Sequence, residues 1–337
     1  MDTFKFHFKE IDHEGQPVGM FSKKGTLTAD RLTLDRISIP TVSIINADGH
    51  AHNAMVRWRD MTGDIDYRAF RVTSGGLKKV VHRINSACSH AKAGLRLQTL
   101  REAGQADLFR VWNCPKCSSA IDLCGREASP QVWCPYCDAL FTQASVGPRD
   151  EANFGICDEC GLYSCPKSFT ILYIWFIVIA YGFKYETKRM CNVCMRKEAW
   201  MMLLVNFIFV VGVIPSLLQL IRAYFGGSNL SGTFHELDPA NAAMQKGNTD
   251  LACHLYQRLL EKQPHQAGLH YNHGLAQLKA GNLDHASEAF GASLTSCINF
   301  EPAFIAQDRL LDTVGELKKL ESTRQRFFGV DYVPNET

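Results

Sequence analysis

Apolar and polar residues alternate along the first 73 residues, as expected of strands that bury one face. In the run FKFHFKE, Phe4, Phe6 and Phe8 share a face, and the turn-forming segments EGQP, ADG and TGD separate the later alternating runs. The period then changes to that of a helix. Its apolar positions are Leu77, Val80, Val81, Ile84 and Cys88. The pattern predicts an N-terminal β-barrel-like domain closed by a helix, over residues 1–106.

Two apolar stretches without any charge occupy the middle of the chain, at Ser168–Phe183 and Ala199–Ile221. The first would span about 24 Å as a helix, short of the roughly 30 Å hydrocarbon core of a bilayer. The second would span about 34 Å, and it is apolar on every face. We therefore predict a transmembrane helix over 199–222, with a re-entrant hairpin at Pro215 as the alternative. The insert 168–183 is interpreted as a non-crossing segment that dips into the membrane or joins a ribbon core.

The C-terminal third has helical periodicity and an internal repeat of 34 residues, which aligns a segment from Gly247 with one from Gly281. The matched pairs are Gly247/Gly281, Asn248/Asn282, Asp250/Asp284, Ala252/Ala286, Tyr256/Phe290 and Leu260/Leu294. This pattern resembles the tetratricopeptide repeat. The resemblance implies α-hairpin repeats over 235–327 that present a concave surface to a protein or peptide. His270 and His273 are interpreted as surface or groove side chains rather than metal ligands.

Eight of the 13 cysteines form four C-x-x-C pairs, which is the spacing of metal ligands. The ligands of the first predicted site are Cys114, Cys117, Cys134 and Cys137. This segment, 112–141, resembles a zinc ribbon, and Trp112, Trp133 and Phe141 are expected to supply most of its small core. Cys124 lies between the pairs and is interpreted as a bystander rather than a spare ligand.

The second predicted site has the apolar insert between its two pairs. Its ligands are Cys157, Cys160, Cys191 and Cys194. The segment over 155–196 resembles membrane-associated zinc ribbons, on the two pairs, the aromatic run from Phe169 to Tyr173 and the basic return Gly182–Tyr185. The resemblance implies an insert that lies against the membrane or folds back as a short apolar hairpin. Cys165, close to the first pair, is an alternative ligand.

Basic residues between the two apolar stretches set the predicted orientation. They are Lys184, Lys188, Arg189, Arg196 and Lys197. Only Arg222 closely follows the second stretch, so the positive-inside rule places the ribbons and the N-terminal domain in the cytoplasm. The expected localisation is a single-pass or monotopic membrane protein. The segment MDTFKFHFKEID has no apolar core of a secretory signal, which agrees with a reducing compartment for the cysteines.

The net charge of +2 gives the whole chain no strong electrostatic bias, although residues 1–110 hold 17 Lys and Arg against 12 Asp and Glu. The order of strands and closing helix resembles a pleckstrin-homology-like domain. That resemblance implies binding of phosphoinositide head groups or peptides. Lys23, Lys24, Arg57 and Arg59 form the candidate basic rim, and an ordinary solvated surface is the favoured interpretation of it.

The sequence carries none of the common nucleotide-binding, zinc-protease or serine-hydrolase motifs. Two closed four-thiolate sites also leave no open position for a substrate. We therefore predict a multidomain α+β protein that is not an enzyme. It would be a membrane-anchored adaptor or scaffold with two structural Zn²⁺ ions, contacting membrane lipid and binding a protein partner through the repeats in a larger complex. The alternative is a membrane-tethered zinc-ribbon regulator or nucleic-acid-binding protein; nucleic acid is not favoured, because Arg126 is the only cation between the first knuckles.

Overall fold

The computed structural model describes residues 3–12, 15–50, 52–143, 153–177, 180–208, 213–225 and 232–329. The chain divides into two compact units, one of residues 1–125 with 134–137 and the other of residues 126–133 with 138–337. The boundary passes through the first cysteine segment, whose two C-x-x-C pairs both belong to the first unit. Strands and helices occur in both units, so the predicted α+β class is confirmed.

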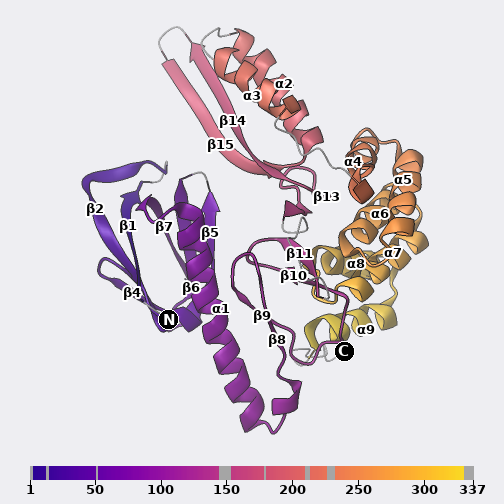
Figure 1. Ribbon diagram of the computed structural model, residues 1–337, viewed down its shortest axis with the longest axis horizontal. Coiled ribbons are helices and arrows are strands. Elements are labelled where there is room, and N and C mark those ends of the chain that lie inside the picture. Colours follow the sequence, from indigo (N-terminus) through magenta and orange to yellow (C-terminus); the bar gives the residue numbers. More distant parts are fainter. Residues whose placement is uncertain are drawn as a thin grey trace. The chain divides into compact units, whose positions relative to one another are not determined.

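Seven antiparallel strands form the sheet of the first unit, in the order β4-β3-β2-β1-β7-β6-β5 (Figure 1). They are β1 (Phe4–Ile11), β2 (Pro17–Leu27), β3 (Arg31–Leu34), β4 (Ile37–Pro40), β5 (Ile44–His50), β6 (Asn53–Arg59) and β7 (Ile65–Ser74). The predicted alternation is confirmed in β1, where Phe6 and Phe8 are buried and Lys5 and His7 between them are exposed. The described sheet is open, with β4 and β5 at its edges, so the predicted closure into a barrel is wrong.

Helix α1 (Leu77–Glu102) packs on this sheet, as its apolar periodicity predicts (Figure 1). Val80, Ile84 and Cys88 are buried in one cluster with the aromatic side chains of the strands. Asn85 fixes the helix to β5: its Oδ1 accepts from the Ala47 amide at 2.7 Å and its Nδ2 donates to the Ala47 carbonyl at 2.8 Å. Each such buried bond stabilises the fold by about 1 kcal/mol.

Three pairs of short strands carry the cysteine segments. The pairs are β8 (Val111–Asn113) with β9 (Ala120–Asp122), β10 (Gln131–Cys134) with β11 (Ala139–Thr142), and β12 (Gly155–Ile156) with β13 (Tyr163–Ser164). The insert of the second cysteine segment is a long hairpin of β14 (Lys167–Ile177) and β15 (Ala180–Met190), paired from Lys167↔Met190 to Ile177↔Ala180. The insert therefore folds back on itself as a hairpin, the form that the ribbon resemblance allowed, and this hairpin is longer than the short one expected.

Helices α2 (Asn192–Ile208) and α3 (Val213–Phe225) pack against each other and against β14 (Figure 1). With 17 and 13 residues they are about 26 and 20 Å long. In the described ranges no helix has the length and apolar character needed to cross a membrane. The predicted transmembrane helix over 199–222 is therefore wrong, and the membrane localisation derived from it is not supported.

The physical reason lies in how the apolar run is divided. The prediction used only the length of the uncharged run, which begins at Ala199. Helix α2 begins seven residues earlier and includes the charged residues Arg196, Lys197 and Glu198. Asn206, inside the run, is buried, and its Nδ2 donates to the Leu172 carbonyl at 2.9 Å and to Ser216 Oγ at 2.6 Å. These bonds join two helices and a strand, so the run belongs to a packed helical hairpin.

The described part of the C-terminal region contains six helices, which confirms the predicted helical character of 235–327. They are α4 (Leu237–Gln245), α5 (Thr249–Lys262), α6 (Ala267–Lys279), α7 (Leu283–Ser296), α8 (Glu301–Val314) and α9 (Leu317–Phe328). The matched glycines Gly247 and Gly281 follow α4 and α6 with φ of 81° and 83°, a conformation that favours glycine. Gly274 of α6 faces Phe290 of α7, and a Cβ there would lie 2.6 Å from the ring.

Candidate metal centres

The first cysteine cluster brings together all four predicted ligands of residues 112–141. Cys114 and Cys117 follow β8, Cys134 ends β10, and Cys137 precedes β11. Their four Sγ atoms lie within 4.8 Å of one another, and all four side chains are buried. The Sγ–Sγ distances are 3.7 Å between Cys114 and Cys137 and 3.5 Å between Cys117 and Cys134.

Backbone turns help to aim the two thiols of three of the pairs at one point. Ser118, Asp138 and Gly161 follow the second cysteine of three pairs, and their φ values are 59°, 54° and 70°. The Ser118 amide donates to the Cys114 carbonyl at 2.8 Å, and the Gly161 amide donates to the Cys157 carbonyl at 2.9 Å. A left-handed residue is uncommon outside glycine and is found mainly in tight turns. These turns are therefore part of how the sequence builds the clusters.

The second cluster consists of Cys157, Cys160, Cys191 and Cys194, the four ligands predicted for residues 155–196. Their Sγ atoms also lie within 4.8 Å of one another, and Cys160 Sγ is 3.9 Å from Cys191 Sγ. Backbone amides point at the sulfurs: the Cys191 amide donates to Cys157 Sγ at 3.3 Å and the Cys194 amide to Cys191 Sγ at 3.5 Å. Such bonds favour the thiolate form that binds a metal.

Two further features of the second cluster were not predicted. Gln245, at the end of α4, donates its Nε2 to Cys194 Sγ at 3.4 Å and to Cys191 Sγ at 3.7 Å. Cys194 lies in the first turn of α2, where the positive end of the helix dipole stabilises negative charge. No local sequence signal links Gln245 to cysteines 51 and 54 residues away. The helical region therefore supplies an outer hydrogen-bond partner to this cluster.

The dimensions of both clusters are compatible with zinc. A tetrahedral ion with Zn–S bonds of about 2.3 Å places its sulfurs about 3.8 Å apart. The measured separations of 3.5, 3.7 and 3.9 Å agree with that edge length. The two groups of four cysteines can thus each hold one ion, in line with the two Zn²⁺ predicted from the sequence.

Proximity of the thiols also shifts their ionisation. A hydrogen bond with Cys114 holds the pKa of Cys117 well below the usual range, and one with Cys160 does the same to the pKa of Cys157. Hydrogen bonding to Cys114 raises the pKa of Cys134. Four thiols at this spacing do not all ionise together, because each new thiolate meets an existing one. A dication removes that conflict, which is the chemistry that this donor set favours.

The helical region also holds the strands beside the cysteines, through paired hydrogen bonds from two buried asparagines. Asn299 accepts from the Trp133 amide at 3.0 Å and donates to the Trp133 carbonyl at 2.7 Å. Asn272 of α6 does the same for Tyr163 of β13, with both distances 2.8 Å. Each asparagine satisfies both backbone groups of one residue, as a neighbouring strand would. We call these contacts the asparagine clamps.

Aromatic side chains complete the clamps. The Trp133 ring meets the edge of Phe300, with centroids 6.2 Å apart and planes at 76°. The Tyr163 ring lies against Gly268 of α6, where an added Cβ would be 2.3 Å from Tyr163 Cγ. Trp133 therefore packs in the cluster of the helical region, whereas the sequence placed it in the ribbon's own core. Phe141 is buried as predicted.

The remaining candidate residues lie outside the two clusters. Cys124 Sγ accepts from the Arg110 amide at 3.3 Å, and Cys165 belongs to the apolar cluster of the helical region. In the described part of the chain, no metal-binding group includes His270 or His273. His270 Nε2 instead bonds with the Pro264 carbonyl at 2.7 Å.

Acidic partners neutralise much of the candidate basic rim. Lys23 pairs with Glu10 and Asp35, at 3.1 and 3.0 Å. Arg57 pairs with Asp48 at 2.6 Å. Two of the four rim cations thus have acidic partners, as is common on an ordinary solvated surface, which is the interpretation favoured from the sequence.

No protein-family model matches the chain, and the search of curated proteins likewise finds no match.

Proposed function

We propose that the chain is a non-enzymatic adaptor or scaffold subunit, with two zinc ions that serve structure rather than chemistry. The observation that carries this proposal is the pair of asparagine clamps, which bind strands beside both cysteine clusters to the helical region. Four thiolates complete the coordination of a tetrahedral ion, so neither centre offers a position to a substrate. The second metal site and the helices of the same unit then act as one supporting framework.

The resemblance of three parts of the chain to known kinds of domain supports the same proposal. The cysteine segments have the strand pairs and tight knuckles of zinc ribbons. Gly247, Gly281 and the contact of Gly274 with Phe290 fit tetratricopeptide-like hairpins. Strand order followed by a covering helix fits a pleckstrin-homology-like domain. Modules of all three kinds serve as interaction domains, which favours a scaffold.

The partner-binding surface that we assign lies on α2 and α3, because part of the helical region is already covered by the chain's own strands. Exposed apolar side chains recur at helical spacing on both helices. They include Trp200, Leu204 and Phe207 on α2, and Ile214, Leu218, Ile221 and Phe225 on α3. Trp200 Nε1 donates to Tyr224 Oη at 3.2 Å, so the two exposed rows adjoin. Contiguous apolar surface of this kind marks a site of protein association.

A photo-crosslinking experiment tests this proposal. A photoreactive leucine analogue at position 204 of the zinc-loaded chain should crosslink to one defined protein, identified by mass spectrometry. The paired substitution Leu204→Glu with Leu218→Glu should abolish capture of that protein. Leu317→Glu is the control, because Leu317 is similarly exposed, at 67 % against 63 % for Leu204, but lies on α9. Capture that persists in the paired variant, or is lost in the control, would contradict the assignment.

A further inference from the structure

The sheet of the first unit has one face turned away from α1, and basic residues line it. Successive side chains of a strand point to opposite faces, and directly opposed residues of paired strands share a face. Phe6 and Gly25 oppose each other on the face that α1 covers, so Lys5 and Lys24 point away from the helix. The cations on this outer face are Lys5, Lys9, Lys24, Arg31, Arg59 and Arg71. We call this surface the basic sheet face.

The strands supply little acid to balance this face. Among the described strand residues, Asp48 is the one carboxylate that points there, and it pairs with Arg57 at 2.6 Å. With Arg57 included, seven cations meet one carboxylate, which leaves a formal excess of +6. Beside Asp35, which pairs with Lys23 at 3.0 Å, the described turns contribute Asp12, Asp30, Asp60 and Asp64. Counting all four against the face still leaves a formal excess of +2.

The centre of the basic sheet face places like charges opposite each other. Lys9 and Arg71 are directly opposed across β1 and β7, an arrangement that destabilises a sheet. Arg71 is nevertheless held in place, because its Nε donates to Asn53 Oδ1 at 3.2 Å and its Nη2 to the Gly15 carbonyl at 3.3 Å. In the described part of the chain, no ion pair joins Lys9 or Arg71 to a carboxylate. A phosphate between these side chains would remove the repulsion and accept hydrogen bonds from both.

The cations follow a diagonal across the sheet rather than a single strand. The track begins with Arg31 on β3, passes Lys5 and Lys9 on β1, and ends with Arg59 on β6. Four strand spacings separate β3 from β6, which is about 19 Å. A track of this length exceeds a small anion and suits a polymer that carries one negative charge in every repeat.

An exposed aromatic ring lies on the same face. Tyr67 of β7 is 64 % exposed and opposes Arg57 of β6. Bases of a single strand stack on exposed aromatic rings and on guanidinium planes, whereas the bases of a duplex are already stacked on one another. An acidic polypeptide would need the cations alone, so the ring beside them favours a nucleic-acid strand.

We propose that the basic sheet face binds single-stranded nucleic acid, with backbone phosphates on the diagonal of cations and a base on Tyr67. Lysine and arginine form charge-assisted hydrogen bonds with phosphate oxygens, and these contacts do not depend on base sequence. The surface differs from the first cysteine segment, where Arg126 is the only cation between the knuckles. It also uses no residue of α2 or α3, so it is independent of the proposed scaffold function.

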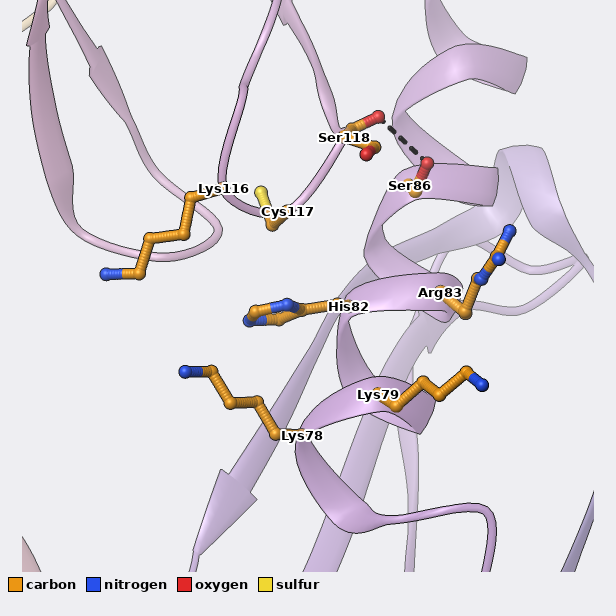
Figure 2. Close-up of a pocket in the computed structure, with 8 residues that line it drawn as sticks. All are labelled: Lys78, Lys79, His82, Arg83, Ser86, Lys116, Cys117 and Ser118. Atoms are coloured by element: carbon orange, nitrogen blue, oxygen red, sulfur yellow. Dashed lines mark hydrogen bonds between the residues drawn. The ribbon is translucent and has the colours of Figure 1, made fainter. Parts of the chain in front are cut away.

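The cations at the start of α1 do not extend this surface. Figure 2 shows Lys79 and Arg83 leaving α1 on the side away from the first cysteine knuckle. They lie over the Phe4 ring, at 5.8 and 6.0 Å from its centroid. The two other cations of that cavity, Lys78 and Lys116, would balance the formal charge of −2 of a zinc ion with four thiolates. Lys79 and Arg83 are exposed, so they provide a matched control for charge removal.

Fluorescence anisotropy with a labelled oligonucleotide of about 16 nucleotides, the upper site size of one single-strand-binding domain, tests the proposal. Oligouridylate and oligodeoxythymidylate are titrated separately with the zinc-loaded full chain. Lys5→Gln with Lys24→Gln should weaken binding at least about tenfold, because both exposed cations would contact phosphates. The slope of log K against log salt concentration should become shallower by about 1.4, since each phosphate contact on a single strand contributes about 0.7. Lys79→Gln with Arg83→Gln removes the same charge and should stay within about twofold.

A second variant tests the stacking contact separately from charge. Tyr67→Ala should weaken binding by about 5- to 160-fold, the equivalent of one stacked base, and should leave the salt slope unchanged. Because Tyr67 is exposed, its removal should not unfold the sheet. Circular dichroism and zinc content are measured for every variant, so that a loss of folding is distinguished from a loss of binding.

Each outcome bears on the proposal. Binding that weakens in the sheet-face variants and not in the control supports it. No binding to the wild type, or equal weakening in the control, overturns it. Polyglutamate that competes as well as the unlabelled oligonucleotide, together with an unchanged Kd for Tyr67→Ala, overturns it in favour of an acidic protein. Tighter binding of oligouridylate identifies RNA as the ligand, and tighter binding of oligodeoxythymidylate identifies DNA.

Discussion

Replacing Gly268 by alanine tests the contact between the helical region and Tyr163, because two effects of the substitution have opposite sign. Gly268 is the second residue of α6, so alanine there improves helix stability by less than the about 1 kcal/mol gained in a helix interior. The added Cβ would, however, lie 2.3 Å from Tyr163 Cγ and 2.4 and 2.5 Å from the two Cδ atoms. Contacts under about 3 Å require one of the two groups to move.

The Tyr163 ring has little freedom to move away. Its side chain is 1 % exposed, and Asn272 holds both its amide and its carbonyl. Overpacking of a buried site costs about 1–3 kcal/mol, and the close approach to Cγ, next to the backbone, favours the upper part of that range. After the helix term is subtracted, we expect Gly268→Ala to destabilise the protein by about 1–2 kcal/mol.

Gly291→Ala is the matched control. Gly291 lies inside α7 of the same unit, and no atom would come within 4 Å of its added Cβ. This variant should gain about 1 kcal/mol from helix propensity alone. The two variants should thus differ by about 2–3 kcal/mol, which corresponds to about 4–12 °C in Tm for a unit of this size.

Urea denaturation and differential scanning calorimetry of the zinc-loaded chain measure the difference. A double-mutant cycle with Tyr163→Ala isolates the contact: with the ring removed, Gly268→Ala should change from destabilising to neutral or stabilising. A Gly268→Ala variant as stable as Gly291→Ala would refute the close packing of Tyr163 on α6.

Three further predictions concern the metal, the clamps and pH. Metal analysis should find two zinc ions per chain, and Cys160→Ser should leave one; one ion in the wild type would contradict the two-centre structure. Asn299→Ala removes the hydrogen bonds of Asn299 with the buried amide and carbonyl of Trp133, and each loss should destabilise the protein by about 1–3 kcal/mol. The rate of amide hydrogen exchange at residues 131–134 should therefore rise. An unchanged exchange rate would argue against this clamp. Burial lowers the pKa of His270 and His273 below the ordinary 6.5, so the unfolded chain binds more protons at these residues than the folded chain does. The free energy of unfolding should therefore fall as the pH drops below about 6.5. In urea denaturation, the variant with both histidines replaced by glutamine should show a shallower fall, and an identical dependence on pH would contradict the burial of these rings.

Features encoded by neighbouring residues were predictable from the sequence. The two groups of four cysteines were predictable because a C-x-x-C knuckle is a local structure with its own spacing. Alternation in FKFHFKE identified β1, since a strand exposes every second residue. Gly247 and Gly281 marked the ends of α4 and α6 because their backbone conformation favours glycine.

Features that depend on distant contacts were not predictable. Asparagine is usually a surface residue, yet Asn272 and Asn299 are both buried. Asn272 is hydrogen-bonded to a residue 109 positions earlier, and Asn299 to one 166 positions earlier. From the sequence, Gly268 is only a residue of low helix propensity, whereas in the structure its missing side chain makes room for the Tyr163 ring. The apolar run 199–222 was misinterpreted for a related reason: its uncharged length gave no information about where α2 and α3 begin and end.

A metal ion held by the second cysteine cluster would link that cluster to the proposed partner surface. Helix α2 begins at Asn192, between Cys191 and Cys194, and those cysteines share one buried cluster with Met195, Ala199 and Met202 on the inner side of that helix. Removing this ion would release the first turn of α2 and disturb the row that contains Leu204, although Leu204 itself is not a ligand. Chelation and the paired glutamate substitution should therefore both abolish partner capture. Circular dichroism separates the two routes, because only chelation should lower the helical signal; capture that survives full zinc removal would show that the exposed face forms without the metal.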